Sequence, residues 1–170
     1  PTTTATSESR VTRCTPMTRA SQGASAPNTA NASTGSVVST PAVVGDSVYV
    51  GADTRALLRM PIDCATDGTG CDATAIGVAT AAISSSPAIA DGVAYVGSED
   101  GRLHAFDAAC PPDLRPCPPL WSAETGGPIT SSPVVTDELV VVGSEDGSVY
   151  AFPRYCTAED CQPTWVGPTG

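Results

Sequence analysis

Residues 85–110 read SSPAIADGVAYVGSEDGRLHAFDAAC, and residues 131–156 read SSPVVTDELVVVGSEDGSVYAFPRYC. A weaker copy, STPAVVGDSVYVGADTRALLRMPIDC, occupies residues 39–64. The proline near the start of each copy and the cysteine at its end both recur every 46 residues. A fixed period of this size marks a repeat architecture, so we expect three copies of one structural unit.

The middle copy shows which secondary structure the unit contains. Pro87 suits the start of a strand, where a missing backbone N–H is tolerated. Asp91-Gly92 is a strong hairpin signal, and Gly101 can supply the positive φ that the next turn requires. Between and after these turns lie four short β-rich or apolar runs, which we predict to be strands: Ser86–Ala90, Val93–Gly97, Leu103–Phe106 and Leu120–Ala123.

Four short antiparallel strands per repeat match the content of one β-propeller blade. We therefore predict an all-β fold of about three four-stranded antiparallel blades, at residues 39–82, 83–128 and 129–170. A solenoid or a β-sandwich is the alternative. A sandwich also contains many short strands, but it would not give a strict 46-residue period. Closed propellers usually contain about four to eight blades. Three blades predict an incomplete ring: a fragment of a longer protein, or an arc that other copies complete.

Residues 1–38 differ in composition from the repeats. They are rich in Thr, Ser and Ala and show no helical or strand periodicity, so we expect a flexible arm. Within it, residues 14–20 (CTPMTRA) resemble residues 117–123 (CPPLWSA) and are a candidate last strand of a preceding blade. The chain begins with Pro1 rather than Met, which indicates a processed form or a fragment.

SSPAIADGVAYVGSEDGRLHAFDA, followed by PLWSAETGGPITSSP, resembles the PQQ-like β-propeller repeat. That repeat is found in quinoprotein alcohol dehydrogenases and in the outer-membrane assembly lipoprotein of the β-barrel insertion machinery. The resemblance covers about residues 39–167 and is closer to the non-catalytic lipoprotein type. It implies a propeller fold, whereas function varies among proteins with this repeat. The sequence departs from the family pattern where a short Thr-Gly turn is replaced by a cysteine-bracketed loop in every repeat.

The seven cysteines indicate the redox compartment. Six fall in pairs at equivalent repeat positions, and their spacing does not match the close CxxC-type knuckles of structural zinc sites. We predict three local disulfides, which favour a periplasmic, cell-surface or secreted location. The predicted pairs are Cys64–Cys71, Cys110–Cys117 and Cys156–Cys161. Cys14 is left over, as a lone thiol or as part of a preceding repeat.

The charge balance excludes some classes of partner. The 8 basic residues are all arginine, against 18 acidic residues and a net charge of −10. Nucleic-acid binding requires clustered Lys and Arg, so we expect no nucleic-acid partner. No apolar run approaches the ~18 residues of a membrane-spanning helix.

The sequence offers no catalytic, cofactor-binding or metal site that we can place. His104, the single histidine, lies where the third repeat has Tyr150, which indicates that the position requires a flat side chain. Trp121 and Trp165 occupy equivalent positions, so we expect them to pack between blades rather than to stack on a quinone. We therefore predict no cofactor and no enzymatic activity.

The remaining candidate is the turn between the second and third strands of each repeat. In an up-and-down blade, these turns lie on one face of the ring, and the cysteine loops lie on the other. The acidic residues of the turns would form a ladder that could attract a cation or a basic partner. They are Asp53, Glu99, Asp100, Glu145 and Asp146. The simpler interpretation is ordinary solvated turn chemistry.

These observations predict a non-catalytic, extracytoplasmic interaction or scaffold module. Its partners would be another protein or copies of itself, bound through loops or open blade edges. A fragment of a PQQ-dependent quinoprotein dehydrogenase and a self-assembling structural subunit are the two alternatives.

Overall fold

The computed structural model describes residues 35–63 and 72–170, which form three four-stranded antiparallel sheets. Cys14, Cys64, Cys71 and the candidate strand at residues 14–20 lie outside the described residues. Blade 1 contains β1 (Ala42–Val44), β2 (Ser47–Gly51), β3 (Ala56–Pro61) and β4 (Thr74–Val78). Blade 2 contains β5 (Ala88–Ala90), β6 (Val93–Gly97), β7 (Arg102–Asp107) and β8 (Trp121–Glu124). Blade 3 contains β9 (Val134–Val135), β10 (Leu139–Ser144), β11 (Ser148–Pro153) and β12 (Trp165–Pro168).

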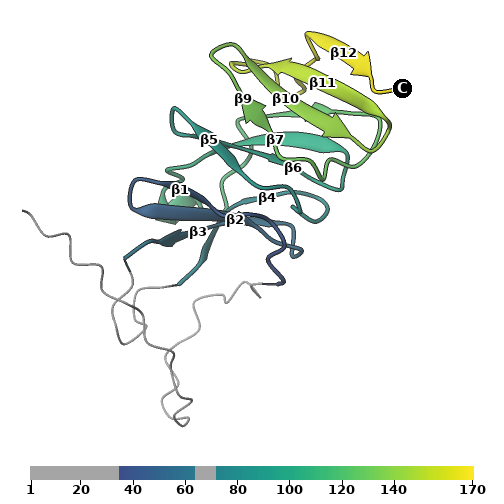
Figure 1. Cartoon of the computed structure of the whole chain (residues 1–170). Coiled ribbons are helices and arrows are strands. Elements are labelled where there is room, and N and C mark those ends of the chain that lie inside the picture. The colour runs from purple at the N-terminus through teal and green to yellow at the C-terminus, as the bar shows by residue number, and fades with distance from the viewer. Residues whose placement is uncertain (1–34, 64–71) are drawn as a thin grey trace, which may run out of the picture.

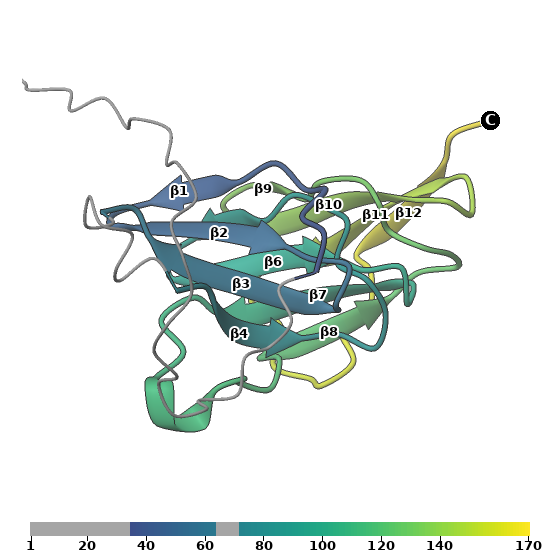
Figure 2. The same cartoon turned by 90° about the horizontal axis from the view of Figure 1, so that it is seen from below.

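Each sheet runs up and down, with its strands side by side in chain order. This confirms the prediction of an all-β, incomplete propeller. Figure 1 shows the three sheets stacked one on another in chain order, and in Figure 2 the strands of blade 1 follow one another from β1 to β4 across the sheet. The first strands of successive blades lie next to each other, β1 beside β5 and β5 beside β9. The one helical segment in the described residues is the short 3-10 turn η1 (Pro112–Leu114).

The repeated residues hold neighbouring blades together. The Tyr49 hydroxyl donates to the carbonyl of Ala108 at 3.3 Å, and the Tyr95 hydroxyl reaches the carbonyl of Arg154 at 3.5 Å. Along the edge where the first strands meet, the backbone N–H of Thr40 donates to Ser86 Oγ at 2.8 Å. Ser86 N–H donates in turn to Ser132 Oγ at 3.3 Å. Positions that recur in the sequence therefore recur in their contacts.

Apolar side chains fill both interfaces between blades. Phe106 is fully buried among residues of blades 1 and 2, and Phe152 is fully buried among residues of blades 2 and 3. Full burial of such side chains stabilises the fold by about 1.5–3 kcal/mol each. Trp121, 4% exposed, packs in the second interface as expected. The same expectation is wrong for Trp165, which is 45% exposed because no further blade covers blade 3 in the described residues.

Blade 1 fills its interface with blade 2 without a tryptophan. Its sequence has Ala75 where blade 2 has Trp121, and the pairing of β3 with β4 shifts register between Leu57 and Leu58. Ile76 then joins the core between blades 1 and 2 together with Phe106 and Cys117. Trp121 has the matching neighbours, Phe152 and Cys161, in the next interface. The shift places a smaller side chain where the repeat uses an aromatic one.

Candidate functional site

The structure separates the five acidic turn residues into two kinds. Asp53, Glu99, Glu145 and Asp146 are exposed. The side chain of Asp100 is only 7% exposed and accepts hydrogen bonds from the backbone N–H and the hydroxyl of Thr80, at 3.0 and 2.9 Å. Asp100 thus links the turn of blade 2 to the chain that leaves blade 1.

Asp100 belongs to a buried chain of polar groups. Its carboxylate lies 3.1 Å from His104 Nε2, and His104 Nδ1 lies 2.9 Å from Ser122 Oγ. Burial by itself would raise the pKa of Asp100, but the hydrogen bonds from His104 and Thr80 outweigh it and hold that pKa well below its usual range. The carboxylate is therefore ionised and fully engaged in the fold.

The order Ser122–His104–Asp100 is that of a catalytic triad, yet its surroundings are structural. His104 is 6% exposed and Ser122 is 8% exposed. None of the three residues lines either of the two cavities described below. A nucleophile must reach a substrate and lie beside an oxyanion site, and this hydroxyl lies within a blade sheet. Sequence reasoning missed Ser122 and Thr80 because serine and threonine are common at such positions.

Blade 3 makes a related contact with other groups. The Tyr150 hydroxyl donates to Asp146 at 2.6 Å and accepts from the backbone N–H of Gly126 at 3.1 Å. The hydrogen bond from Tyr150 lowers the pKa of Asp146, and the same bond raises the pKa of Tyr150. His104 and Tyr150 therefore have the same role in their blades: each has a planar ring whose polar group donates a hydrogen bond to the turn aspartate.

Changing Asp100 to Asn should destabilise the protein in a pH-dependent way. Because the folded-state pKa is depressed, the stabilisation is present above the ordinary pKa of 3.8 and is lost as pH falls through the folded-state value. At neutral pH we expect a loss of about 2 kcal/mol, typical of a buried hydrogen-bonded charge. Urea unfolding of both proteins at pH 7, 5, 4 and 3 should show a difference in the free energy of unfolding that is constant from pH 7 to 5 and narrows between pH 4 and 3.

The matched control is Asp146→Asn at the equivalent exposed position, where we expect a smaller loss of stability. A difference between wild type and Asp100→Asn that stays constant from pH 7 to 3 would contradict the role given to the carboxylate.

A further contact between blades involves Arg154, which is 6% exposed. Its Nη2 lies 2.5 Å from a carboxylate oxygen of Asp91, in the first turn of blade 2, and its guanidinium lies 5.2 Å from the ring centre of Tyr155. The equivalent positions are Ile62 in blade 1 and Ala108 in blade 2. This ion pair is therefore specific to the interface between blades 2 and 3.

The structure contains the disulfides Cys110–Cys117 and Cys156–Cys161, with Cα atoms 6.0 and 5.9 Å apart. Each loop also binds the preceding blade, because Cys117 N–H donates to the carbonyl of Ile76 and Cys161 N–H donates to that of Ser122. The cysteine loops therefore close the outer side of the interfaces between blades as well as crosslinking their own blade.

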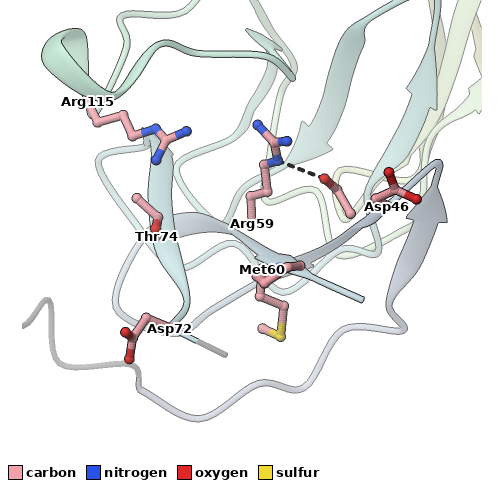
Figure 3. A pocket seen from close by; sticks show the side chains of 8 residues that line it. Asp46, Arg59, Met60, Asp72, Thr74 and Arg115 are labelled. Carbon is pink, nitrogen blue, oxygen red and sulfur yellow. Dashed lines mark hydrogen bonds between the residues drawn. The ribbon is translucent and has the colours of Figure 1, made fainter. Parts of the chain in front are cut away.

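A cavity of about 330 Å³ lies where blades 1 and 2 meet beside the cysteine loop. Arg59 of β3 and Arg115, just after η1, both line it, together with Asp46, Ser47, Asp72 and Thr74. Figure 3 shows the two guanidinium groups on one side of the cavity, with Asp46 and Asp72 apart from each other. A second cavity of about 190 Å³ shares Arg59 and is lined largely by apolar residues. Neither cavity was anticipated from the sequence.

The residues that the structure describes contain no group of three or more His, Cys, Asp or Glu side chains that could hold a metal ion. Within the same residues, no helix has the length and apolar character needed to cross a bilayer.

Comparisons with known proteins agree with the repeat and the fold. Residues 79–166 match the family model described as outer membrane protein assembly factor BamB. Among solved structures, BamB from Moraxella catarrhalis is similar with a TM-score of 0.56 and 19% identity, over 77% of this chain and 36% of that one. The computationally designed Ika4 protein is similar with a TM-score of 0.54 and 14% identity, over 80% of this chain and 76% of that one. The computationally designed Ika8 protein is similar with a TM-score of 0.53 and 20% identity, over 75% of this chain and 35% of that one.

No curated protein matches the sequence. The chain thus spans little more than a third of the BamB chain that it resembles.

Proposed function

Because this chain belongs to the PQQ-like repeat family described as outer membrane protein assembly factor BamB, we propose that it is a non-catalytic interaction module that works outside the cytoplasm. The observation that carries the proposal is that the polar groups of blade 2 serve the fold. Three of them, Asp100, His104 and Ser122, have the chemistry of a catalytic triad but are bonded to one another. His104 and Ser122 are buried, and the side chain of Asp100 is 7% exposed. What the blades present to solvent is loops on a rigid scaffold, which is how binding modules are commonly built.

The location outside the cytoplasm is supported by the cysteine loops. Disulfides form and persist in oxidising compartments and are rare in the cytosol. Cys110–Cys117 and Cys156–Cys161 occupy the same place in successive repeats, which favours a structural role over a redox one. The description of the family as an outer membrane protein assembly factor is consistent with the same location.

A role as part of a quinoprotein dehydrogenase has less support. In that class, acidic and amide side chains hold Ca²⁺ and a tryptophan stacks on the quinone. Trp121 is packed inside an interface, and the described residues supply no ligand cluster that suits the ion. The residues present therefore do not fit the cofactor.

Self-assembly is the second candidate, and one observation favours it. Trp165, equivalent to the buried Trp121, is 45% exposed. The outer face of blade 3 thus presents an aromatic side chain at a position that packs against another blade elsewhere in the chain.

Photo-crosslinking tests the interaction function. A photoreactive phenylalanine analogue at Leu114, 61% exposed on the cysteine-loop side, would be compared with one at Glu145 in the turn of blade 3. In cells that export the protein, we expect an adduct of discrete mass from at least one position. Absence of adducts from both, together with alcohol oxidation by the purified protein supplied with PQQ and Ca²⁺, would overturn the proposal.

A further inference from the structure

Blade 1 departs from the other two blades at positions that meet in one place. At two positions blade 1 has a polar or charged side chain where both other blades have an apolar one. Arg59 stands where the other blades have Ala105 and Ala151. Ser47 stands where they have Val93 and Leu139. Both residues line the cavity of about 330 Å³ between blades 1 and 2.

The strand register shows how these changes open the cavity. In blade 2, Ala105 pairs across the sheet with Trp121, whose ring fills the interface with blade 3. In blade 1, Arg59 pairs with Thr74 instead. The pair of Ala105 and Trp121 in blade 2 thus corresponds to the pair of Arg59 and Thr74 in blade 1. Arg59 and Thr74 both line the cavity, so polar side chains stand here where blade 2 has a packed apolar pair.

Both arginines are held in place by the chain itself. Arg59 Nε donates to Ser47 Oγ at 2.9 Å, and Ser47 is 6% exposed. Arg115 Nε donates to the carbonyl of Cys110 at 3.0 Å, inside the disulfide loop. Because the anchor is Nε, the terminal nitrogens of both guanidinium groups make no hydrogen bond to the residues that the structure describes. Such fixed forks match the two oxygens of a carboxylate, and pre-organisation lowers the entropic cost of binding.

The charges around the arginines favour a singly charged anion. Asp46 and Asp72 line the same cavity and balance its two cations. A doubly charged phosphate would meet more repulsion from these carboxylates, and from the net charge of −10, than a carboxylate would. Because the Debye length is about 8 Å at physiological ionic strength, the distant charges weigh less than the adjacent guanidinium groups.

The second cavity is suited to an apolar group of the same ligand. It shares Arg59 and is lined by Val44, Tyr49, Ile89 and Ala108, which together suit an aliphatic side chain. We propose that the two cavities form one site for an extended peptide segment of a partner protein, with an acidic side chain between Arg59 and Arg115 and an aliphatic side chain beside Tyr49. In an extended peptide, residues two apart point to the same side, so the acidic and aliphatic side chains would lie two positions apart.

This inference rests on the proposed interaction function and adds the chemistry of the partner. The probe is a fluorescent, end-capped peptide of sequence Leu-Ser-Glu-Ser-Leu, and the control peptide carries Gln in place of Glu. Fluorescence anisotropy on the full chain should show binding of the first peptide that is at least about tenfold tighter than that of the second, since charge-assisted hydrogen bonds of this kind are among the strong ones.

Arg115→Gln should lower the affinity for the acidic peptide at least about tenfold. Its matched control is Arg55→Gln, which removes the same charge from an exposed turn and should change affinity less than about twofold. The double change Arg59→Ala with Thr74→Trp restores the residue types found at 105 and 121, and should abolish binding while the thermal transition is kept.

Equal binding of both peptides, or equal affinities for Arg115→Gln and Arg55→Gln, would overturn the site. Competition by inorganic phosphate at the same concentration as acetate, with phosphate the stronger, would overturn the carboxylate preference. Loss of the site leaves the crosslinking result untouched, because crosslinking at Leu114 and Glu145 reports any partner. The two proposals can therefore fail separately.

Discussion

Changing Gly97 to Ala should destabilise the protein by about 3 kcal/mol, at the upper end of what overpacking usually costs. Gly97 ends β6, where the chain that enters blade 3 passes close by. A Cβ atom at this position would lie 2.8 Å from Cβ and 2.9 Å from the carbonyl oxygen of Ile129, a fully buried residue. One of these atoms belongs to the backbone, so a side-chain rotation cannot relieve the clash, and the blade interface must open.

The third repeat provides the control for this experiment. Gly143 occupies the same repeat position, but a Cβ there would meet only the side chain of Ser131, with Oγ at 3.5 Å and Cβ at 3.7 Å. The local hydrogen bonds are alike, because Ser85 Oγ binds the N–H and carbonyl of Gly97 as Ser131 Oγ binds those of Gly143. Gly143→Ala should therefore cost less than about 1 kcal/mol. Urea unfolding at neutral pH measures both, and equal losses would show that the close approach to Ile129 is not the cause.

The strands of this fold could be predicted from the sequence because each repeat carries the evidence independently. Val93–Gly97 was predicted as a strand and is observed with those bounds. The predicted strand Leu103–Phe106 is observed as Arg102–Asp107. Turn chemistry is local: Gly101 and Gly147 adopt positive φ, as the turn signal required, and Arg55 adopts it at the equivalent position in blade 1. Because the same strand and turn signals recur three times at one period, few folds other than a propeller agree with the sequence.

The candidate site could not be predicted, for two physical reasons. The bonds from His104 to Asp100 and Ser122 depend on which face of a strand each side chain occupies after blades pack, and spacing alone does not fix this. The cavity beside Arg59 depends on the register shift between β3 and β4. A shift of one residue reverses the faces of a strand, and it arises from packing against the next blade rather than from local preference.

The clearest sequence signal for the cavity was a mismatch between repeats. Blade 1 has Ala75 in the place of Trp121, and it has Arg59 and Ser47 where both other copies have apolar residues. In a repeat protein, a structural requirement recurs in every copy. A polar residue that appears in one copy at a position that is apolar in the others therefore indicates a contact specific to that copy: an ion pair between blades for Arg154 and the lining of a cavity for Arg59.

Trp121→Ala should cost about 3–5 kcal/mol, whereas Trp165→Ala should cost less than about 1 kcal/mol, although the two residues occupy the same repeat position. Trp121 is 4% exposed, and its ring lies 5.9 Å from that of Tyr95, between blades 2 and 3. Removing it would leave a large cavity in that interface. Trp165 is 45% exposed on the outer face of blade 3, so replacing it with Ala removes fewer packing contacts.

This pair of variants also tests whether the arc stands alone in solution. If a second copy covers the outer face of blade 3, Trp165 is buried there and its replacement should cost several kcal/mol, with a midpoint that rises with protein concentration. If the face is free, the cost stays small at every concentration. Chemical unfolding of both variants at protein concentrations a hundredfold apart separates these outcomes. A large, concentration-independent cost for Trp165→Ala would contradict both, because it would mean that the ring is packed within a single chain.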